Sequence, residues 1–182
     1  MADRAERRMT VEEFLDWDDG SDTRHMLVDG VIVAMAPPSQ TRSRIAFATG
    51  KAVDRHVRPP CFVLTEAGLA LSSDTLVQAG IAMTCEPAGP DRLIKSPRLI
   101  IEILSPSNMR EDLAVKILGY RELPSVEEIW AVSSTERSVR LWRRLPEGWL
   151  VTLPIRFGRF RSEALGAEIG RASCRERVCS VV

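Results

Sequence analysis

The sequence has little of what several common protein classes require. Aromatic residues make up 5% of its 182 residues, and only two histidines occur. No stretch approaches the roughly 18–20 consecutive apolar residues that a membrane-spanning helix needs. The charged N-terminal segment MADRAERRMT is not followed by an apolar segment of the signal-peptide type. We therefore expect no membrane partner and a cytoplasmic location.

Cysteine is also scarce. Of the four cysteines, Cys61 and Cys85 lie far apart in the body, whereas Cys174 and Cys179 lie near the C-terminus, and none forms a CxxC pair. Zinc sites usually place cysteine and histidine at short, regular spacing. The pattern therefore predicts free thiols and no zinc site.

An excess of positive charge is missing too. The 25 lysines and arginines are balanced by 25 aspartates and glutamates. A high-affinity, non-specific DNA binder usually shows a clear basic excess, so any contact with nucleic acid must rest on a local patch. The candidates are the late arginines, which otherwise form a solvated strand face: Arg137, Arg140, Arg143, Arg144, Arg156, Arg159 and Arg161.

The end of the chain differs from the rest. Its segment GRASCRERVCSVV has no hydrophobic period and looks like a sequencing adapter translated in frame. At 182 residues with 45% hydrophobic content, the chain can bury one sizeable core. We therefore expect a single domain over residues 1–169 and a non-native-looking tail over residues 170–182.

The body alternates between helical and strand patterns. Helices are predicted in TVEEFLDW, over residues 41–57 and in MREDLAVKILGYREL. A hairpin is predicted around Asp29-Gly30, because this dipeptide favours a two-residue turn between strands. Further strands are predicted in CFVLTEAGLAL, TLVQAGIAMTC, RLIIEIL, EEIWAVSS, SVRLWRR and, more weakly, WLVTLPIRF. The fold class is α/β, with a mixed β-sheet flanked by helices.

One carboxylate stands where a charge is unexpected. Glu102 lies inside the apolar run from Leu99 to Leu104. Burying an ionised group is costly unless it is paired and hydrogen-bonded. On the helix that follows, Asp112, Lys116 and Tyr120 recur every four residues and share one face. If this helix folds back onto the sheet, Lys116 approaches Glu102.

Two interpretations of this pair remain open. The first is a structural ion pair. The second is a phosphodiesterase site, in which a carboxylate holds a divalent cation and an ammonium group activates water or stabilises charge on the phosphate.

From Met9 to about Ile169 the chain resembles the Uma-two family of restriction endonucleases, members of the PD-(D/E)XK nuclease superfamily. The resemblance rests on the stretches TVEEFLDW, LVDGVIVAMAPPS, IIEILSPS, REDLAVKILGYRELPSVEEIWAV and VRLWRRLPEGW, in this order. It implies a restriction-endonuclease-like α/β domain, a magnesium site and DNA as the substrate. It places the family's glutamate at Glu102, its displaced lysine at Lys116 and a recurrent aromatic residue at Tyr120.

The sequence departs from the family at four positions in three segments. The family's metal-binding aspartate, in Val-Pro-Asp or Gln-Pro-Asp, is replaced by Gly80 in Gln-Ala-Gly. A Tyr-Glu pair before the hairpin turn is replaced by His25 and Met26, and Arg42 stands where histidine is common. The resemblance therefore implies a weakened magnesium site with Glu102 as its remaining family carboxylate.

Other residues bear on the missing ligand. Glu66 and Asp74 lie in the right part of the chain to replace it, but each is also an ordinary exposed strand or turn residue. Gly80 has a structural interpretation as well, because glycine inside a strand can mark a bulge or a close approach of backbone. His25 is interpreted as a hydrogen-bonded structural histidine.

Three functions follow from these observations. The chain is a magnesium-dependent endonuclease with impaired activity, a catalytically silent relative that binds nucleic acid or a partner subunit, or a structural or homo-oligomeric module that keeps Glu102 and Lys116 as a buried pair. The first function predicts metal-dependent cleavage of DNA. The second predicts salt-sensitive binding of DNA without cleavage, and the third predicts neither cleavage nor binding.

Overall fold

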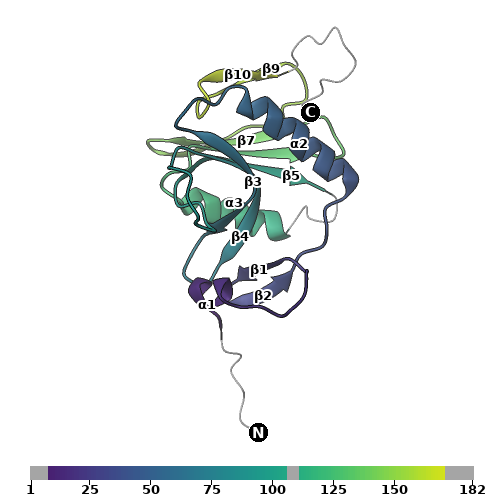
Figure 1. Cartoon of the computed structure of the whole chain (residues 1–182). Helices are drawn as coiled ribbons and strands as arrows, with labels where there is room; N and C mark the ends of the chain where they lie inside the picture. The colour runs from purple at the N-terminus through teal and green to yellow at the C-terminus, as the bar shows by residue number, and fades with distance from the viewer. Residues whose placement is uncertain (1–7, 106–110, 171–182) are drawn as a thin grey trace.

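A computed structural model of the chain describes residues 8–105 and 111–170 (Figure 1). Its helices are α1 (Val11–Leu15), α2 (Gln40–Asp54) and α3 (Glu111–Glu122). Its strands are β1 (His25–Val28), β2 (Val31–Ala34), β3 (Phe62–Ala70), β4 (Leu76–Thr84), β5 (Pro97–Leu104), β6 (Glu128–Ser133), β7 (Val139–Leu145), β8 (Gly148–Val151), β9 (Arg159–Ser162) and β10 (Ala167–Gly170).

The central sheet has the strand order β2-β1-β4-β5-β6-β7-β8, and β3 pairs with β4 outside this path. Only β5 and β6 pair in parallel among the described strands, and α3 forms the crossover between them. Parallel neighbouring strands need such a crossover because the C-terminal end of the first strand and the N-terminal end of the second lie at opposite ends of the sheet. The predicted mixed sheet flanked by helices is confirmed, and within it β4 pairs with β5 in antiparallel fashion.

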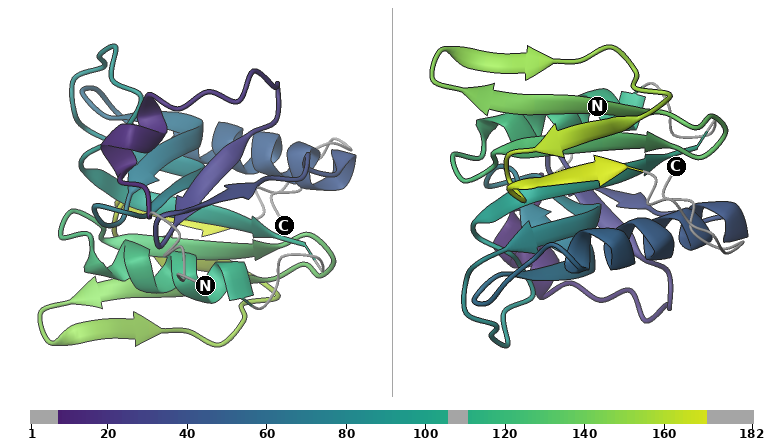
Figure 2. Two further views of the ribbon diagram at one scale, coloured as in Figure 1. Left: turned by 90° about the horizontal axis from the view of Figure 1, so that it is seen from below. Right: turned by 90° about the horizontal axis from the view of Figure 1, so that it is seen from above.

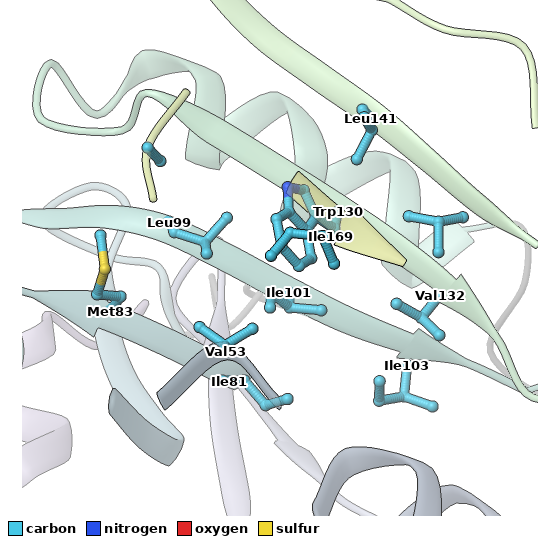
Figure 3. Packing of buried hydrophobic residues seen from close by; sticks show 12 residues of the cluster. Val53, Ile81, Met83, Leu99, Ile101, Ile103, Trp130, Val132, Leu141 and Ile169 are labelled. Carbon is cyan, nitrogen blue, oxygen red and sulfur yellow. The ribbon is translucent and has the colours of Figure 1, made fainter. Parts of the chain in front are cut away.

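The two faces of the sheet carry separate hydrophobic clusters. Helix α2 and the β9–β10 hairpin cover one face, and α3 covers the other (Figures 1 and 2). On the first face Val53 of α2 packs with Ile101 and Trp130, and Figure 3 shows this cluster. On the second face Ile117 and Tyr120 of α3 pack with strand residues. Alternate residues of β5 therefore enter different clusters, which sets the direction of each side chain.

Local sequence explains the N-terminal elements. The hydroxyl of Thr10 accepts from the amide of Glu13, whose carboxylate accepts from the amide of Thr10, so the predicted capping box is present. Asp29 and Gly30 have positive φ angles of 49° and 76°, the conformation that a two-residue hairpin turn requires. The register that pairs Val28 with Val31 follows from this turn.

Near the middle of the β3–β4 hairpin, the alternation of side chains between the two faces of the sheet is interrupted. Ile81 belongs to the first cluster and Ala79 to the second, although a regular strand would put them on the same face. Opposite this point on β3, Glu66 has a φ of 54°, a conformation that is uncommon outside glycine. Gly80 therefore lies at a bend, which agrees with the structural interpretation of a glycine inside a strand.

The prediction of free thiols is wrong for Cys61 and Cys85, which form a disulfide bond. The β3–β4 register pairs Phe62 with Thr84, so the next residue outward on each strand is a cysteine facing the other. The sequence separation of 24 residues hides this proximity, because it depends on the hairpin register. Cys174 and Cys179 lie outside the described residues.

The C-terminal β9–β10 hairpin was not predicted, and Gly170 pairs with Arg159 at its open end. Gly170 thus belongs to a strand, one residue past the predicted boundary at 169. The rest of the predicted tail, residues 171–182, lies outside the described residues. No helix in the described parts of the chain is long and apolar enough to cross a membrane.

Candidate active site

Glu102 of β5 points toward α3 and is only 3% exposed. Its Oε1 atom accepts hydrogen bonds from the Lys116 ammonium at 3.2 Å and from the Tyr120 hydroxyl at 2.7 Å. The Lys116 ammonium also donates to the carbonyl of Gln78 at 2.7 Å. The approach of Lys116 to Glu102, expected if α3 folds back, is therefore present, whereas the catalytic roles of these residues stay predictions.

The spacing of the helix explains this arrangement. Lys116 and Tyr120 are four residues apart, so both side chains leave the same face of α3 and reach the same carboxylate oxygen. The side chain of Asp112, the third member of the predicted stripe, lies outside what the structure describes. The helix thus supplies two donors to one oxygen of Glu102.

Tyr120 is fully buried, and burial raises the pKa of its hydroxyl well above the usual 10.0, with the neighbouring Glu102 charge as a further cause. Each effect disfavours the phenolate. Tyr120 is therefore a hydrogen-bond donor to Glu102 at neutral pH and not a base.

Gly80 lies directly beside Glu102 on the neighbouring strand. The β4–β5 register pairs Ile81 with Ile101, and continuing it by one residue sets Gly80 opposite Glu102. A Cβ atom on Gly80 would lie 3.8 Å from Oε2 of Glu102 and 3.0 Å from the carbonyl oxygen of Ile101. The position of the family's aspartate thus faces the second oxygen of the buried carboxylate, at close backbone contact.

Two hollows adjoin this pair. A hollow of about 400 Å³ is lined by Met26, Arg42, Glu102 and Lys116, among other residues. A second, of about 650 Å³, contains Gly80 in its wall. The two share part of their lining: Met35, Ala36, Pro37, Pro38, Arg42 and Ile103. Met26, Arg42 and Gly80, which the resemblance singles out as departures from the family, therefore all line the cleft that the two hollows form.

The alternative acidic residues do not supply a second ligand beside Glu102. Glu66 lines the second hollow, but its carboxylate pairs with Arg24 at 2.5 Å and is 47% exposed. Asp74 accepts from the hydroxyl of Ser72 at 2.6 Å in the turn before β4, and it lines neither hollow. Both residues therefore have local partners, as their interpretation as ordinary strand and turn residues predicts.

The donors present do not fit a resident magnesium ion. Magnesium prefers near-octahedral oxygen ligands, usually including one or two carboxylates. In the described ranges no three histidine, cysteine, aspartate or glutamate side chains come close enough to hold a metal. One oxygen of Glu102 already accepts from Lys116 and Tyr120, and Gly80 offers no side chain to complement the other.

Comparison with known proteins agrees with this architecture. The Uma2 family, described as "Putative restriction endonuclease", matches residues 11–170. The chain belongs to the Uma2 family. The match begins at the first residue of α1 and ends at the last residue of β10. It therefore spans every helix and strand described here, and Gly80, Glu102 and Lys116 lie within the matched range.

A curated relative and a solved structure are also similar to this chain. The chain is 25% identical over 150 residues to the uncharacterized protein slr1290 of Synechocystis sp., covering 79% of each chain. Its fold is similar to the crystal structure of a "putative nuclease belonging to DUF820" from Anabaena variabilis, with a TM-score of 0.70 and 16% identity, covering 87% of this chain and 91% of the other. At this identity the similarity shows the fold alone.

Some late arginines do not form an open phosphate-facing surface. Arg143 donates to Glu128 at 2.8 Å and is 24% exposed. Arg144 donates to three backbone carbonyls and lies over the ring of Trp149. Both side chains are thus committed to the protein itself, which contradicts both a free patch and a fully solvated face for these positions.

A second buried carboxylate, Glu128, was not predicted from the sequence. Glu128 is 0% exposed and binds Trp130, Arg143, Ser162 and the backbone of Glu163. A signal existed, since Glu128 starts the apolar run of β6, but its partners Ser162, the last residue of β9, and Glu163 come from more than 30 residues away.

Proposed function

We propose that the chain is a DNA endonuclease of the PD-(D/E)XK type with strongly reduced activity. The observation that carries the proposal is the Glu102–Lys116 pair, which faces Gly80 at the wall of the cleft. The fold and the Uma2 membership support the nuclease class. DNA as the substrate, dependence on magnesium and weakened binding of that ion are the proposal's own content.

Each site residue has a role in this proposal. Lys116 brings a positive charge to the wall of the hollow, where it stabilises negative charge on a phosphate. Glu102 holds that ammonium in place through a hydrogen bond of 3.2 Å. Tyr120 donates to the same carboxylate oxygen and fixes its orientation, so Tyr120 is a positioning residue.

Activity is low because the second carboxylate is missing. Without an acidic side chain at position 80, magnesium affinity at the cleft is weak, and water and phosphate are poorly activated. The chain nonetheless keeps the backbone geometry that would bring a residue at position 80 within reach of Glu102, since a Cβ there lies 3.8 Å from Oε2.

Restoring the missing ligands tests the proposal. Gly80→Asp combined with Met26→Glu should raise magnesium binding, measured by calorimetry, and magnesium-dependent nicking of a plasmid above that of the native chain. Adding Glu102→Ala to this background should abolish both gains. If the double variant folds but binds no more metal and cleaves no faster, the restored position does not form a metal site with Glu102 and the proposal is wrong.

A catalytically silent module is the second candidate. It is favoured by the hydrogen bonds of Lys116, because its ammonium already donates to both Glu102 and the carbonyl of Gln78. This candidate predicts salt-sensitive DNA binding, or homo-oligomer formation, with no cleavage in the native chain at any magnesium concentration.

A further inference from the structure

Arg42 occupies the wall shared by the two hollows of the cleft. It lies in the first turn of α2 and is half-buried. Its guanidinium forms no ion pair with the part of the chain that the structure describes, whereas the neighbouring charges are paired: Lys116 with Glu102, and Arg24 with Glu66. A half-buried guanidinium without a carboxylate partner is well suited to bind a phosphate in bidentate fashion.

The charge of the cleft points the same way. The two ion pairs cancel, and Asp22 lies exposed at the rim of the larger hollow, where solvent screens it. Among the described charges that line the cleft, Arg42 and Asp22 stand outside these ion pairs, and Arg42 is the more buried of the two. The inner part of the cleft therefore offers an unpaired positive group to an anion.

Phe47 adds an aromatic surface beside Arg42. It lies one turn and a half further along α2, and the residues of α2 that line the larger hollow share one helical face: Arg42, Ser43, Ala46 and Phe47. The Phe47 side chain is 72% exposed. Its ring therefore stands open at a hollow of about 650 Å³, which falls in the range of roughly 300–1,000 Å³ typical of ligand pockets.

We propose that this hollow binds an unpaired nucleotide of single-stranded DNA, with its phosphate on Arg42 and its base stacked on Phe47, and that this binding needs no metal ion. An aromatic ring can stack on a base face only when the base is not enclosed in a duplex. The proposal rests on the proposed function for its choice of DNA as the ligand. It goes beyond it by assigning the strand state of the DNA and the two residues that select it.

Binding without cleavage is the direct test. A fluorescently labelled single-stranded oligodeoxynucleotide and the duplex of the same sequence are titrated with the full chain in EDTA, and anisotropy is measured. The single strand should bind more tightly than the duplex. Phe47→Ala should weaken single-strand binding about tenfold, the effect of losing one base–aromatic stack, whereas Phe47→Tyr, which keeps a ring, should bind as the native chain does.

The chain supplies matched controls for both residues. Phe157 is 91% exposed and lies away from the cleft, so Phe157→Ala should leave binding unchanged. Arg42→Gln should weaken binding and reduce the slope of log K against log salt by about 0.7, the value for one phosphate contact on a single strand. Arg44→Gln, two residues along the same helix and outside the cleft lining, should change neither by a comparable amount.

Specific outcomes overturn this inference. Equal affinity for single strand and duplex, equal losses in Phe47→Ala and Phe157→Ala, or binding that appears only with magnesium each contradict it. These results differ from failure of the proposed endonuclease, because that failure shows as missing cleavage in the Gly80→Asp, Met26→Glu variant while metal-free binding persists.

Discussion

Two buried glutamates on adjacent strands have opposite surroundings. Glu102 on β5 and Glu128 on β6 are 3% and 0% exposed. Glu102 faces α3, whereas Glu128 faces the β9–β10 hairpin on the other side of the sheet. Both carboxylates are removed from water, and Glu102, unlike Glu128, lines one of the two hollows of the cleft.

The difference lies in how completely each carboxylate is hydrogen-bonded. Both oxygens of Glu128 are in use: Oε1 accepts from Arg143 at 2.8 Å and from the Glu163 amide at 3.0 Å, and Oε2 accepts from Ser162 at 2.6 Å and from Trp130 at 3.2 Å. At Glu102 the two donors share Oε1, while Oε2 faces Gly80. Burial of a charge alone therefore does not indicate chemistry, and the partners of each oxygen are the better guide.

The largest expected effect is on stability at Glu128. Glu128→Gln leaves one accepting oxygen for four donors and puts an amide group among them, so we expect a loss of about 3 kcal/mol in the free energy of unfolding. Urea denaturation followed by circular dichroism measures it. Glu102→Gln keeps an accepting oxygen for its two donors but removes the counter-charge of the buried Lys116 ammonium, so it should cost about 2 kcal/mol. A loss at Glu102 as large as that at Glu128 would end the distinction between them.

A smaller effect is expected at Tyr120. Tyr120→Phe removes a buried hydrogen bond to a charged group and should cost about 2 kcal/mol at neutral pH. Because the folded-state pKa of Tyr120 is raised above 10.0, its contribution is complete below pH 10 and is lost as pH rises through the folded pKa. Between pH 10 and the folded pKa, the native chain should therefore lose up to about 1.4 kcal/mol per pH unit from this group, and Tyr120→Phe should lack this component.

The chain permits a direct measurement of that titration. Tyr120 is its only tyrosine, so phenolate absorbance in the near ultraviolet reports this residue alone. Folded protein should show no phenolate signal at pH 10, and the signal should appear together with unfolding. A phenolate signal at that pH in a folded sample would show that Glu102 and burial do not hold the proton on Tyr120.

The smallest expected effect separates charge from space at Gly80. Without metal, Gly80→Asp should be less stable than Gly80→Ala by about 1 kcal/mol, because a second carboxylate beside Glu102 adds repulsion. Gly80→Ala alone tests the 3.0 Å approach of a Cβ atom to the Ile101 carbonyl. Magnesium should raise the melting temperature of the Asp variant and not that of the Ala variant; the same response in both would mean that the metal does not bind at this position.

The surroundings of Glu102 on α3 could be predicted from the sequence. A charge inside an apolar run and a four-residue repeat on the next helix are local patterns, and they place Lys116 and Tyr120 beside Glu102. The position of Gly80 required the resemblance to the family, because nothing in the glycine itself indicates a missing ligand. The roles of these residues stay predictions.

The partners of Glu128 could not be predicted, because Ser162 and Arg143 lie far from it along the chain. Ser162 lies in β9, a strand whose four residues, RFRS, carry little strand signal. Arg143 was interpreted as a surface residue, since nothing in β7 shows that the later hairpin covers it. The disulfide between Cys61 and Cys85 was missed for the same reason, because hairpin register and not spacing brings the two sulfur atoms together.

That disulfide also closes the β3–β4 hairpin, which contributes residues to the cleft, into a covalent ring. Residues 61–85 are joined end to end, and the ring contains both Glu66 and Gly80. A protease that cuts at the exposed turn residues Ser72 and Ser73 would leave β3 and β4 as one covalent unit. The two strands would separate on a denaturing gel only after a reducing agent is added, so a nicked molecule can keep the strand that carries Gly80 bound beside Glu102.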